Sequence, residues 1–398
     1  MSRVVITSAG VVSPLGSSVE AFMRNLESGN KGIKNIENFN TEFFPTRFGA
    51  EAKEDNKVLL FEQSADRKEK FINHAVDELL QKSNIAGYNP KNRSLHLGAG
   101  IDYFDLVSYV DNQSYKIRDW DMHCKRSNNV VNSIALKYNI RGGHSTNVSA
   151  CVASTQSIGL SFRILKQNPE MAIITGGFDS MLCHLHYLGF YKLGALSNWE
   201  GEPGEACRPF DKNRCGLVIG EGGVAFFLQN DEIADKNNIL AEIVGYASTM
   251  DSYMVTDPHP EGKYLARAAF TAIKEAGITP EDIDCVHAHG TGTFRNGLAE
   301  AKAMQLIFGE QFSKIPVFSL KGQIGHLIGA CGAMEILGVI DSLKNQRILP
   351  TVNFNDPDTD VPLNVIKNKP LELDIKYILK LNASFGGQNT ALVLKKYE

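Results

Sequence analysis

The chain has 398 residues, 43% of them hydrophobic, and a formal net charge of −4. This length allows two domains or two closely packed halves, and the charge balance excludes the basic surface that nucleic-acid binding requires. The start lacks the apolar segment of a secretory signal, and no stretch reaches the roughly 18 apolar residues of a membrane span. Seven scattered cysteines without a Cys-x-x-Cys pair indicate a reducing compartment. We therefore expect a soluble cytoplasmic protein.

The first half of the chain alternates apolar segments typical of buried strands with amphipathic segments typical of helices. We expect strands near 3–7, 95–100, 171–177 and 220–228, helices near 18–28, 64–83 and 129–138, a long excursion over 102–128, and loop over 178–211. Arg67, Lys68 and Lys70 begin one of these helices. They predict either a solvated face or a docking patch for an acidic partner.

The second half alternates strands and helices more regularly. We expect strands near 240–248, 283–289, 315–320, 371–380 and 389–395, with helices near 262–277, 297–308 and 327–344. This alternation predicts a largely parallel sheet covered on both faces. A weak repeat, in which Gly222-Gly223 closes one half and Gly386-Gly387 the other, indicates two similar βαβ-type halves that share one core. We place these halves at residues 1–239 and 240–398.

Cys151 lies where a short apolar strand gives way to a helix. Unpaired backbone N–H groups and the helix dipole at such a junction favour thiolate over thiol, which suits a nucleophile. The alternative is a buried structural cysteine, because free cysteine is among the most buried residue types. Three later segments at strand ends favour the nucleophile: His287 to Thr293, Ser319 to Gly332, and Asn382 to Gly387.

Two histidine pairs raise the alternative of a metal site. His287 and His289 alternate on one strand, and His184 and His186 have the same spacing. Neither pair has an acidic or cysteine third ligand at a typical spacing. We therefore predict that the chain binds no metal.

Taken together, these segments resemble the active site of elongating β-ketoacyl-acyl carrier protein synthases. The resemblance spans essentially the whole chain and rests on Ala150-Cys151 opening a helix, His289-Gly290-Thr291-Gly292-Thr293, Lys321 followed by His326, and Phe385-Gly386-Gly387. It implies an α/β thiolase-like fold whose two halves pack as a layered α-β-α-β-α core. It also implies a 3-oxoacyl-acyl carrier protein synthase, an acyltransferase that condenses an enzyme-bound acyl chain with malonyl-acyl carrier protein in fatty-acid-type elongation.

The resemblance assigns a role to each matching residue. Cys151 accepts the acyl chain, and the backbone N–H groups of Cys151 and Phe385 form the oxyanion hole. His289 and His326, as neutral donors, bind the malonyl thioester oxygen and hold the enolate. Lys321 holds the histidine network, and Thr291 and Thr293 bind the phosphopantetheine arm. Phe385 gates the acyl pocket, and Phe190 lines that pocket.

Glu335 is the expected ionic partner of Lys321, because a buried lysine without a carboxylate is costly. The resemblance implies no metal or redox cofactor, since the phosphopantetheine arm belongs to the acyl carrier protein. The expected partners are acyl carrier protein and either a second copy of the chain or a homologous ketosynthase or chain-length-factor subunit. Nucleic acid and membranes are not expected partners.

The gate departs from the family pattern. Ala383 replaces a large aromatic residue and Ser384 replaces a hinge glycine. A positive φ at Ser384 would cost strain, which predicts a stiffer loop and a widened or redirected pocket. These departures leave open a specialised ketosynthase of a type II polyketide or polyene pathway, similar to aryl polyene synthesis, that works with a chain-length-factor-like partner.

Two other classes are disfavoured. A catalytically silent chain-length factor typically lacks the nucleophile, whereas Cys151 and its partners are all kept. A thiolase would have a second catalytic cysteine where Phe385-Gly386-Gly387 stands. The sequence leaves open the length and saturation of the acyl chain.

Overall fold

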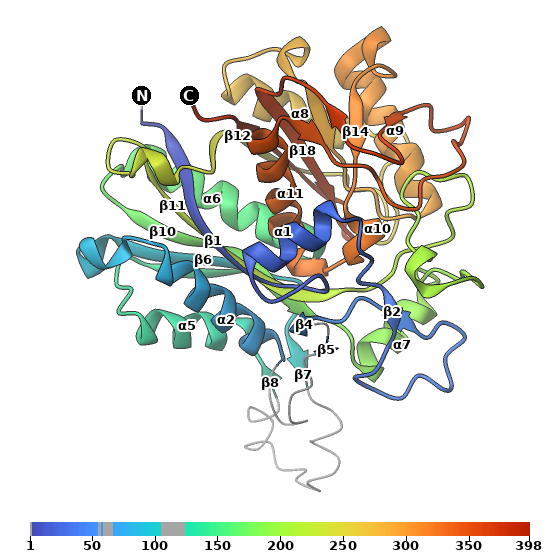
Figure 1. Cartoon of the computed structure of the whole chain (residues 1–398), viewed down its shortest axis with the longest axis horizontal. Coiled ribbons are helices and arrows are strands. Elements are labelled where there is room, and N and C mark those ends of the chain that lie inside the picture. The colour runs from blue at the N-terminus through green and yellow to red at the C-terminus, as the bar shows by residue number, and fades with distance from the viewer. Residues whose placement is uncertain (1, 55–56, 59–66, 105–123) are drawn as a thin grey trace, which may run out of the picture.

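The computed structural model describes residues 2–54, 57–58, 67–104 and 124–398 (Figure 1). Most of the excursion expected over 102–128, and the first residues of the helix expected over 64–83, lie outside this part of the chain. Within it, one sheet of eleven strands has the order β16-β14-β13-β18-β19-β12-β1-β11-β10-β6-β9. Among the described residues, no helix is both long enough and apolar enough to cross a membrane.

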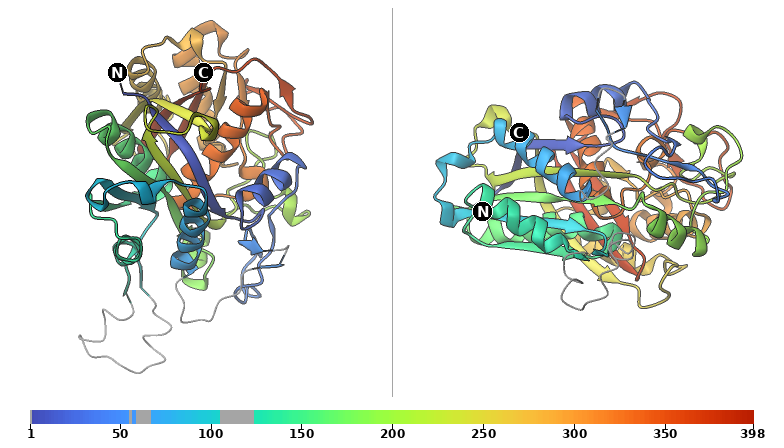
Figure 2. Two further views of the ribbon diagram at one scale, coloured as in Figure 1. Left: turned by 60° about the vertical axis from the view of Figure 1, so that its left-hand side comes forward. Right: turned by 90° about the horizontal axis from the view of Figure 1, so that it is seen from below.

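In the sheet, the strands of residues 4–230 and those of residues 241–395 form two halves that meet at one short seam. The first half contains β1 (Val4–Val12), β6 (Arg93–Ala99), β9 (His144–Val148), β10 (Ala172–Ser180) and β11 (Glu221–Asn230). The second contains β12 (Ala241–Met250), β13 (Cys285–His287), β14 (Pro316–Phe318), β16 (Asn364–Val365), β18 (Tyr377–Ala383) and β19 (Gln388–Lys395). At the seam, Val4–Ile6 of β1 pairs with Ala241–Ile243 of β12. Both chain ends lie at one end of the molecule (Figure 2), where the Arg3 guanidinium stacks on Tyr397.

The helices complete the layered core that the resemblance implies. Two of them, α2 (Arg67–Gln81) and α5 (Ser127–Lys137), cover the outer face of the first half. Two others, α6 (Ala153–Gln167) and α11 (Cys331–Asn345), lie between the halves, while α8 (Lys263–Glu275) and α9 (Phe294–Phe308) cover the second half. In the described part of the chain, the other helices longer than one 3₁₀ turn are α1 (Val19–Glu27), α7 (His184–Lys192) and α10 (Lys321–Ile324).

The two central helices, α6 and α11, determine where the turn that carries Cys151 lies. Residues 331–343 of α11 are all buried and mostly apolar, as expected of a helix enclosed on every side. The start of α6 lies so close to β6 that a Cβ atom at Gly98 would fall 2.3 Å from the Ala153 carbonyl carbon. Glycine at this position therefore allows the turn that carries Cys151 to approach the sheet.

The prediction of a largely parallel sheet is wrong near the seam. The outer strands β9-β6-β10 and β16-β14-β13-β18 are parallel to their neighbours. The inner strands β11, β1, β12 and β19 pair antiparallel. A strand that is buried on both faces has a continuous apolar sequence whether it runs parallel or antiparallel to its neighbour. The hydrophobic pattern therefore does not reveal the strand direction.

The helix α7 was also missed, since residues 178–211 were predicted to be loop. Only Tyr187 among its nine residues is buried. Its sequence therefore lacks the apolar stripe by which an amphipathic helix is detected.

The two alternatives for the start of α2, a solvated face or a docking patch, are both wrong for Arg67 and Lys68. Arg67 forms a bidentate ion pair with the buried Glu221 of β11, with 3.1 Å between Nε and Oε2. Lys68 is buried, and its ammonium donates a hydrogen bond of 2.8 Å to the Ile101 carbonyl oxygen. Only Lys70 of the three is exposed. Two of the cations thus anchor the helix rather than face an acidic partner.

Replacing Arg67 with methionine is expected to lower the free energy of unfolding by about 3 kcal/mol, because the buried Glu221 would lose its ion-pair partner. Urea unfolding followed by circular dichroism measures this effect. The matched control, Lys70→Met on the exposed side of the same helix turn, should change stability by less than about 0.5 kcal/mol. Similar losses in the two variants would contradict the anchoring role.

Candidate active site

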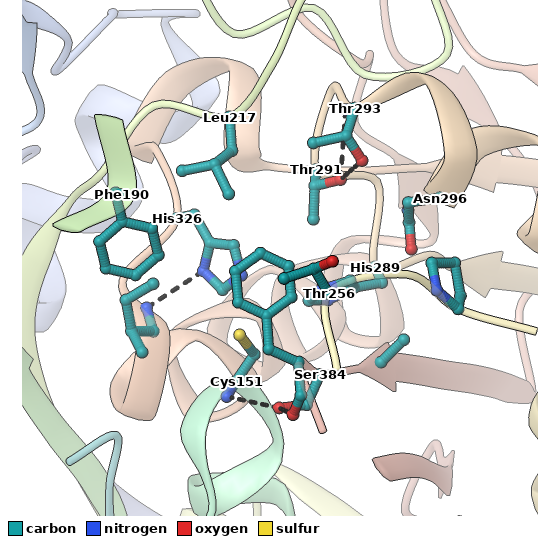
Figure 3. A pocket seen from close by; sticks show the side chains of 14 residues that line it. Cys151, Phe190, Leu217, Thr256, His289, Thr291, Thr293, Asn296, His326 and Ser384 are labelled. Atoms are coloured by element: carbon teal, nitrogen blue, oxygen red, sulfur yellow. Dashed lines mark hydrogen bonds between the residues drawn. The ribbon is translucent and has the colours of Figure 1, made fainter. Parts of the chain in front are cut away.

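Most of the predicted site residues line one pocket between the two halves of the molecule (Figure 3), while Lys321 and Glu335 lie outside its lining. Cys151, His289, His326 and Phe385 line it together with Phe190. The other lining residues are Leu217, Thr256, Pro258, Thr291, Thr293, Asn296, Ile328, Ala383 and Ser384. Of these, Leu217, Thr256, Pro258, Asn296 and Ile328 were not predicted. None of these five carries a catalytic signature, and only the fold brings them to the pocket.

Cys151 lies in a single 3₁₀ turn, Ala150–Val152, between β9 and α6. Ala150 immediately before it has a φ of 50°, a conformation that is uncommon outside glycine and places the next side chain at the pocket floor. Burial raises the pKa of the Cys151 thiol to about 11 and outweighs the lowering effects of Lys321, the Phe385 backbone N–H and the Ser384 hydroxyl. The expectation that the helix start favours thiolate is therefore wrong for the resting site. Removal from water dominates there.

The backbone N–H of Cys151 is already occupied. It donates a hydrogen bond of 3.2 Å to Ser384 Oγ, and that hydroxyl in turn donates to the Phe385 carbonyl oxygen at 2.9 Å (Figure 3). One of the two expected oxyanion donors is thus covered by a side chain of the gate. Ser384 does not have a positive φ, so the strain predicted at this position is absent. The Ser384 hydroxyl supplies a hydrogen-bond acceptor for the Cys151 backbone N–H, which would otherwise lack one.

Phe385 packs against Phe190 of α7 at the pocket. The rings of Phe385 and Phe190 stack with centroids 6.4 Å apart and planes inclined by 29°. Phe190 is therefore positioned by the helix that the sequence did not predict. At the other side of the mouth, Thr291 and Thr293 hydrogen-bond to each other through their hydroxyls at 2.9 Å.

His289 has one ring nitrogen committed as an acceptor. Its Nδ1 lies 3.3 Å from Lys321 Nζ and 3.1 Å from Asn382 Nδ2, both of which are donors. The proton of the neutral ring consequently lies on Nε2. Burial and the Lys321 charge hold the pKa of His289 well below its usual value, so the ring is neutral at physiological pH.

The His326 ring is also neutral with its proton on Nε2, but a different contact fixes it. Its Nδ1 accepts a hydrogen bond of 3.1 Å from the Ile328 backbone N–H, which again leaves the proton on Nε2. Burial, followed by the Lys321 charge, lowers the pKa of His326 to about 3. The two rings lie with centroids 5.2 Å apart and nearly perpendicular planes, at 84°. The pocket thus contains two neutral imidazole rings, each with its proton on Nε2.

The expected ion pair between Lys321 and Glu335 is present, and a second lysine joins it. Lys321 Nζ contacts Glu335 Oε1, and Lys380 Nζ lies 2.5 Å from Glu335 Oε2. All three side chains are completely buried. The two ammonium groups hold the pKa of Glu335 well below its usual value, and Glu335 in turn offsets the effect of burial on Lys321, whose pKa is raised. Lys380 was missed, although a lysine inside the apolar run of β18 signals a buried carboxylate partner.

A second buried carboxylate, also missed, shapes the loop that carries His289. Glu300 of α9 accepts hydrogen bonds from the backbone N–H groups of His289 and Gly290 at 2.6 and 2.8 Å. Asn296 on the same helix donates to it at 2.7 Å. Glu300 therefore holds the backbone between β13 and the threonine pair.

One cluster of metal-ligating groups lies among the described residues: His289, Cys331 and Glu335, with ligand atoms within 4.8 Å of one another. The Lys321 ammonium already bonds to both His289 and Glu335. A metal ion would have to displace that cation. His287 belongs to no such cluster, since its ring packs edge-to-face on Phe318 with centroids 4.6 Å apart.

Comparison with known proteins agrees with this geometry. Residues 1–234 match the family model for the β-ketoacyl synthase N-terminal domain, and residues 240–355 match that for the C-terminal domain. The chain belongs to the β-ketoacyl synthase family. It is 32% identical to the 3-oxoacyl-[acyl-carrier-protein] synthase 2 of Staphylococcus aureus, covering 100% of this chain and 99% of that one. The enzyme of the same name from Coxiella burnetii is also 32% identical, over 99% and 98% of the two chains.

Solved structures share the whole fold. A ketosynthase in complex with the acyl-carrier protein of a type II polyketide synthase has a TM-score of 0.90 and 27% identity over 100% of both chains. A β-ketoacyl synthase from Burkholderia phymatum has a TM-score of 0.88 at the same identity and coverage. This protein therefore has the thiolase-like ketosynthase fold and is a condensing enzyme of the acyltransferase type.

Alkylation of Cys151 by iodoacetamide is expected to accelerate about tenfold per pH unit from about pH 7 to 9, because the thiolate fraction grows toward the raised pKa. Peptide mass spectrometry after timed quenching gives the rate at Cys151 and, as an internal control, at the half-buried Cys215. A rate at Cys151 that reaches its plateau below about pH 8 would show that the resting thiol is ionised.

Proposed function

We propose that this protein is a 3-oxoacyl-[acyl-carrier-protein] synthase that condenses an acyl chain on Cys151 with malonyl-acyl carrier protein. The main support is that the buried Cys151 thiol shares a pocket with two neutral histidines, His289 and His326. In both rings, Nδ1 already accepts a hydrogen bond. A thiol can accept an acyl group, and two N–H donors can stabilise an enolate. The names of the full-length relatives support the choice of substrate.

In the first half-reaction, the Cys151 sulfur attacks the thioester carbonyl of an acyl carrier protein. The sulfur of the carrier leaves, and the thiol proton of Cys151 passes to it. Negative charge develops on the carbonyl oxygen, where the N–H groups of Cys151 and Phe385 act as donors. Ser384 Oγ must release the Cys151 N–H for this step, because it accepts that hydrogen bond in the resting site.

In the second half-reaction, the malonyl thioester oxygen accepts hydrogen bonds from Nε2–H of His289 and His326. Carbon dioxide leaves, and its bonding electrons form an enolate. The enolate carbon attacks the acyl carbonyl, and the Cys151 sulfur departs as a thiolate, which takes up a proton from water to restore the thiol. Both rings donate without carrying charge, since burial keeps them neutral. The Lys321 ammonium behind His289 adds a favourable field for the enolate.

The partners follow from this chemistry. Thr291 and Thr293 lie at the pocket mouth, where the phosphopantetheine arm of a carrier protein would enter. The proposal includes no resident metal or redox cofactor, because the arm belongs to the carrier. A second copy of the chain or a homologous chain-length-factor subunit is the proposed oligomeric partner. The solved relative described as the ishigamide ketosynthase/chain length factor, at 26% identity and a TM-score of 0.85, supports this type of pairing.

A specialised polyketide or polyene ketosynthase is the second candidate, and the gate favours it. Ala383 lines the same pocket as Cys151, next to Ser384 and Phe385. A large aromatic side chain in place of Ala383 would take up part of that pocket. The small side chain therefore leaves room that a rigid acyl chain could use.

Replacing Cys151 with alanine should abolish acyl transfer, whereas replacing His289 or His326 with alanine should lower malonyl decarboxylation at least about a hundredfold. Acyl transfer to Cys151 should fall much less in the two histidine variants, because their donors act in the other half-reaction. Intact-mass analysis with acyl carrier protein thioesters measures acylation, and carbon dioxide release measures decarboxylation. Histidine variants that decarboxylate at the parent rate would contradict the proposal.

Competition between polyenoyl and saturated acyl carrier protein thioesters of equal length separates the two candidates. If the room left by Ala383 in the pocket serves a rigid chain, Cys151 should load the polyenoyl substrate faster. Ala383→Phe should remove that preference by filling that room, and it serves as the matched variant. Equal or faster loading of the saturated chain by the parent enzyme would favour ordinary fatty-acid elongation.

A further inference from the structure

We propose that Lys380 and Asn382 are positioning residues that determine which ring nitrogen of His289 carries the proton. They lie two residues apart on β18 and are both completely buried. Alternate residues of a strand point to the same face, and here both contact Glu335 of α11. The inference rests on the proposed role of His289 as an N–H donor in the malonyl half-reaction.

The Lys380 ammonium fixes one end of the Asn382 amide. Lys380 Nζ lies 2.5 Å from Asn382 Oδ1, 2.5 Å from Glu335 Oε2 and 3.2 Å from the Leu381 carbonyl oxygen. An ammonium group has three donors and no acceptor. The amide atom that faces it must therefore be the oxygen. Thr155 Oγ1 donates to the same oxygen at 2.8 Å, which agrees with this orientation.

The Glu335 carboxylate fixes the other end. Asn382 Nδ2 donates to Glu335 Oε2 at 2.9 Å, and an ionised carboxylate only accepts. A flipped amide would direct its oxygen at the carboxylate and its N–H groups at the ammonium. Two unfavourable contacts would thus replace two charge-assisted hydrogen bonds. The orientation of Asn382 is consequently determined by charge on both sides.

The remaining N–H of Asn382 points at His289 Nδ1, 3.1 Å away. Nδ1 must accept this hydrogen bond, so the proton of the neutral ring is placed on Nε2. Lys321 also approaches Nδ1, but at 3.3 Å, and its ammonium donates as well to the His289 carbonyl oxygen at 2.5 Å and to Glu335. Lys321 is thus divided among three acceptors. Asn382, held by Lys380, supplies the shorter contact to the ring nitrogen.

The test uses the full-length enzyme with Asn382→Asp, Asn382→Ala and Lys380→Met, and measures acylation and decarboxylation separately. At about pH 8, we expect Asn382→Asp to decarboxylate malonyl-acyl carrier protein at least about tenfold more slowly than Asn382→Ala, because a carboxylate requires a proton on Nδ1 and removes it from Nε2. Lys380→Met should lose about tenfold, since the amide is then held from one side only. Lys376→Met, an exposed lysine just before the same strand, is the matched control and should equal the parent. Acylation of Cys151 should stay within about threefold of the parent in every variant, which also reports that each one folds.

A pH profile supplies a readout that a purely structural role would not move. The charged and titratable groups around His289 are Lys321, Lys380, Glu335, His326, Cys331 and Glu300. In Asn382→Asp, the added carboxylate favours the imidazolium, which carries protons on both nitrogens. Decarboxylation by that variant should therefore recover as the pH falls from about 8 to 6, whereas the parent should stay flat because its His289 pKa lies well below that range.

Each possible result decides the question. The inference would be overturned if Asn382→Asp decarboxylates as fast as Asn382→Ala at about pH 8. It would also be overturned if decarboxylation by Asn382→Asp does not change with pH. Unchanged decarboxylation in Lys380→Met would overturn it as well. A parallel loss of acylation and decarboxylation in all three variants would show that Lys380 and Asn382 contribute only to packing, and would also overturn it. A parent enzyme that accepts acyl groups but does not decarboxylate malonyl thioesters would instead overturn the proposed function.

Discussion

The site depends on one buried carboxylate held between two ammonium groups. Glu335 comes from α11, Lys321 from α10 and Lys380 from β18, and none of the three side chains is exposed to solvent. Removing three charges from water is expensive, and only close pairing and complete hydrogen bonding offset that cost. Here each carboxylate oxygen contacts one ammonium group, and Asn382 adds a further donor. The arrangement leaves one excess positive charge behind His289, where negative charge forms during the proposed condensation.

The same dry environment shifts the two kinds of reactive group in opposite directions. Burial raises the pKa of Cys151 and lowers the pKa values of His289 and His326, because it disfavours whichever form is charged. All three groups are therefore neutral when the site is empty of substrate. For the histidines, neutrality is the state that the proposed malonyl half-reaction requires. For the cysteine, ionisation has to accompany the arrival of the substrate.

Much of this could be predicted from the sequence, because the strongest signals are local. Apolar periodicity located most strands and helices, and the segment around Cys151 and the three later strand ends identified the groups that line the pocket. The cost of a buried lysine identified Glu335 as the partner of Lys321. These inferences need only neighbouring residues and a general cost of burial.

What could not be predicted depends on contacts between distant segments. Strand direction near the seam leaves no trace in hydrophobicity, and α7 lacks an apolar stripe. Arg67 resembles a solvated cation until the fold places Glu221 beneath it. The pKa of Cys151 was predicted in the wrong direction, because the junction between strand and helix reveals the dipole but not the depth of burial. Likewise, Ser384 was expected to be strained, whereas its hydroxyl forms a hydrogen bond with an amide more than 200 residues away in sequence.

The burial of Cys151 has a consequence for the enzyme between turnovers. Peroxides and other electrophiles react with thiolate rather than thiol. In the resting site, burial raises the pKa of the Cys151 thiol, Phe385 and Phe190 line the same pocket, and Ser384 Oγ accepts the hydrogen bond of the Cys151 backbone N–H. A raised pKa leaves only a small fraction of the thiol ionised near neutral pH. The idle site is therefore expected to react slowly with electrophiles, and removal of the Ser384 hydroxyl would not by itself change that, because burial is the largest cause of the raised pKa.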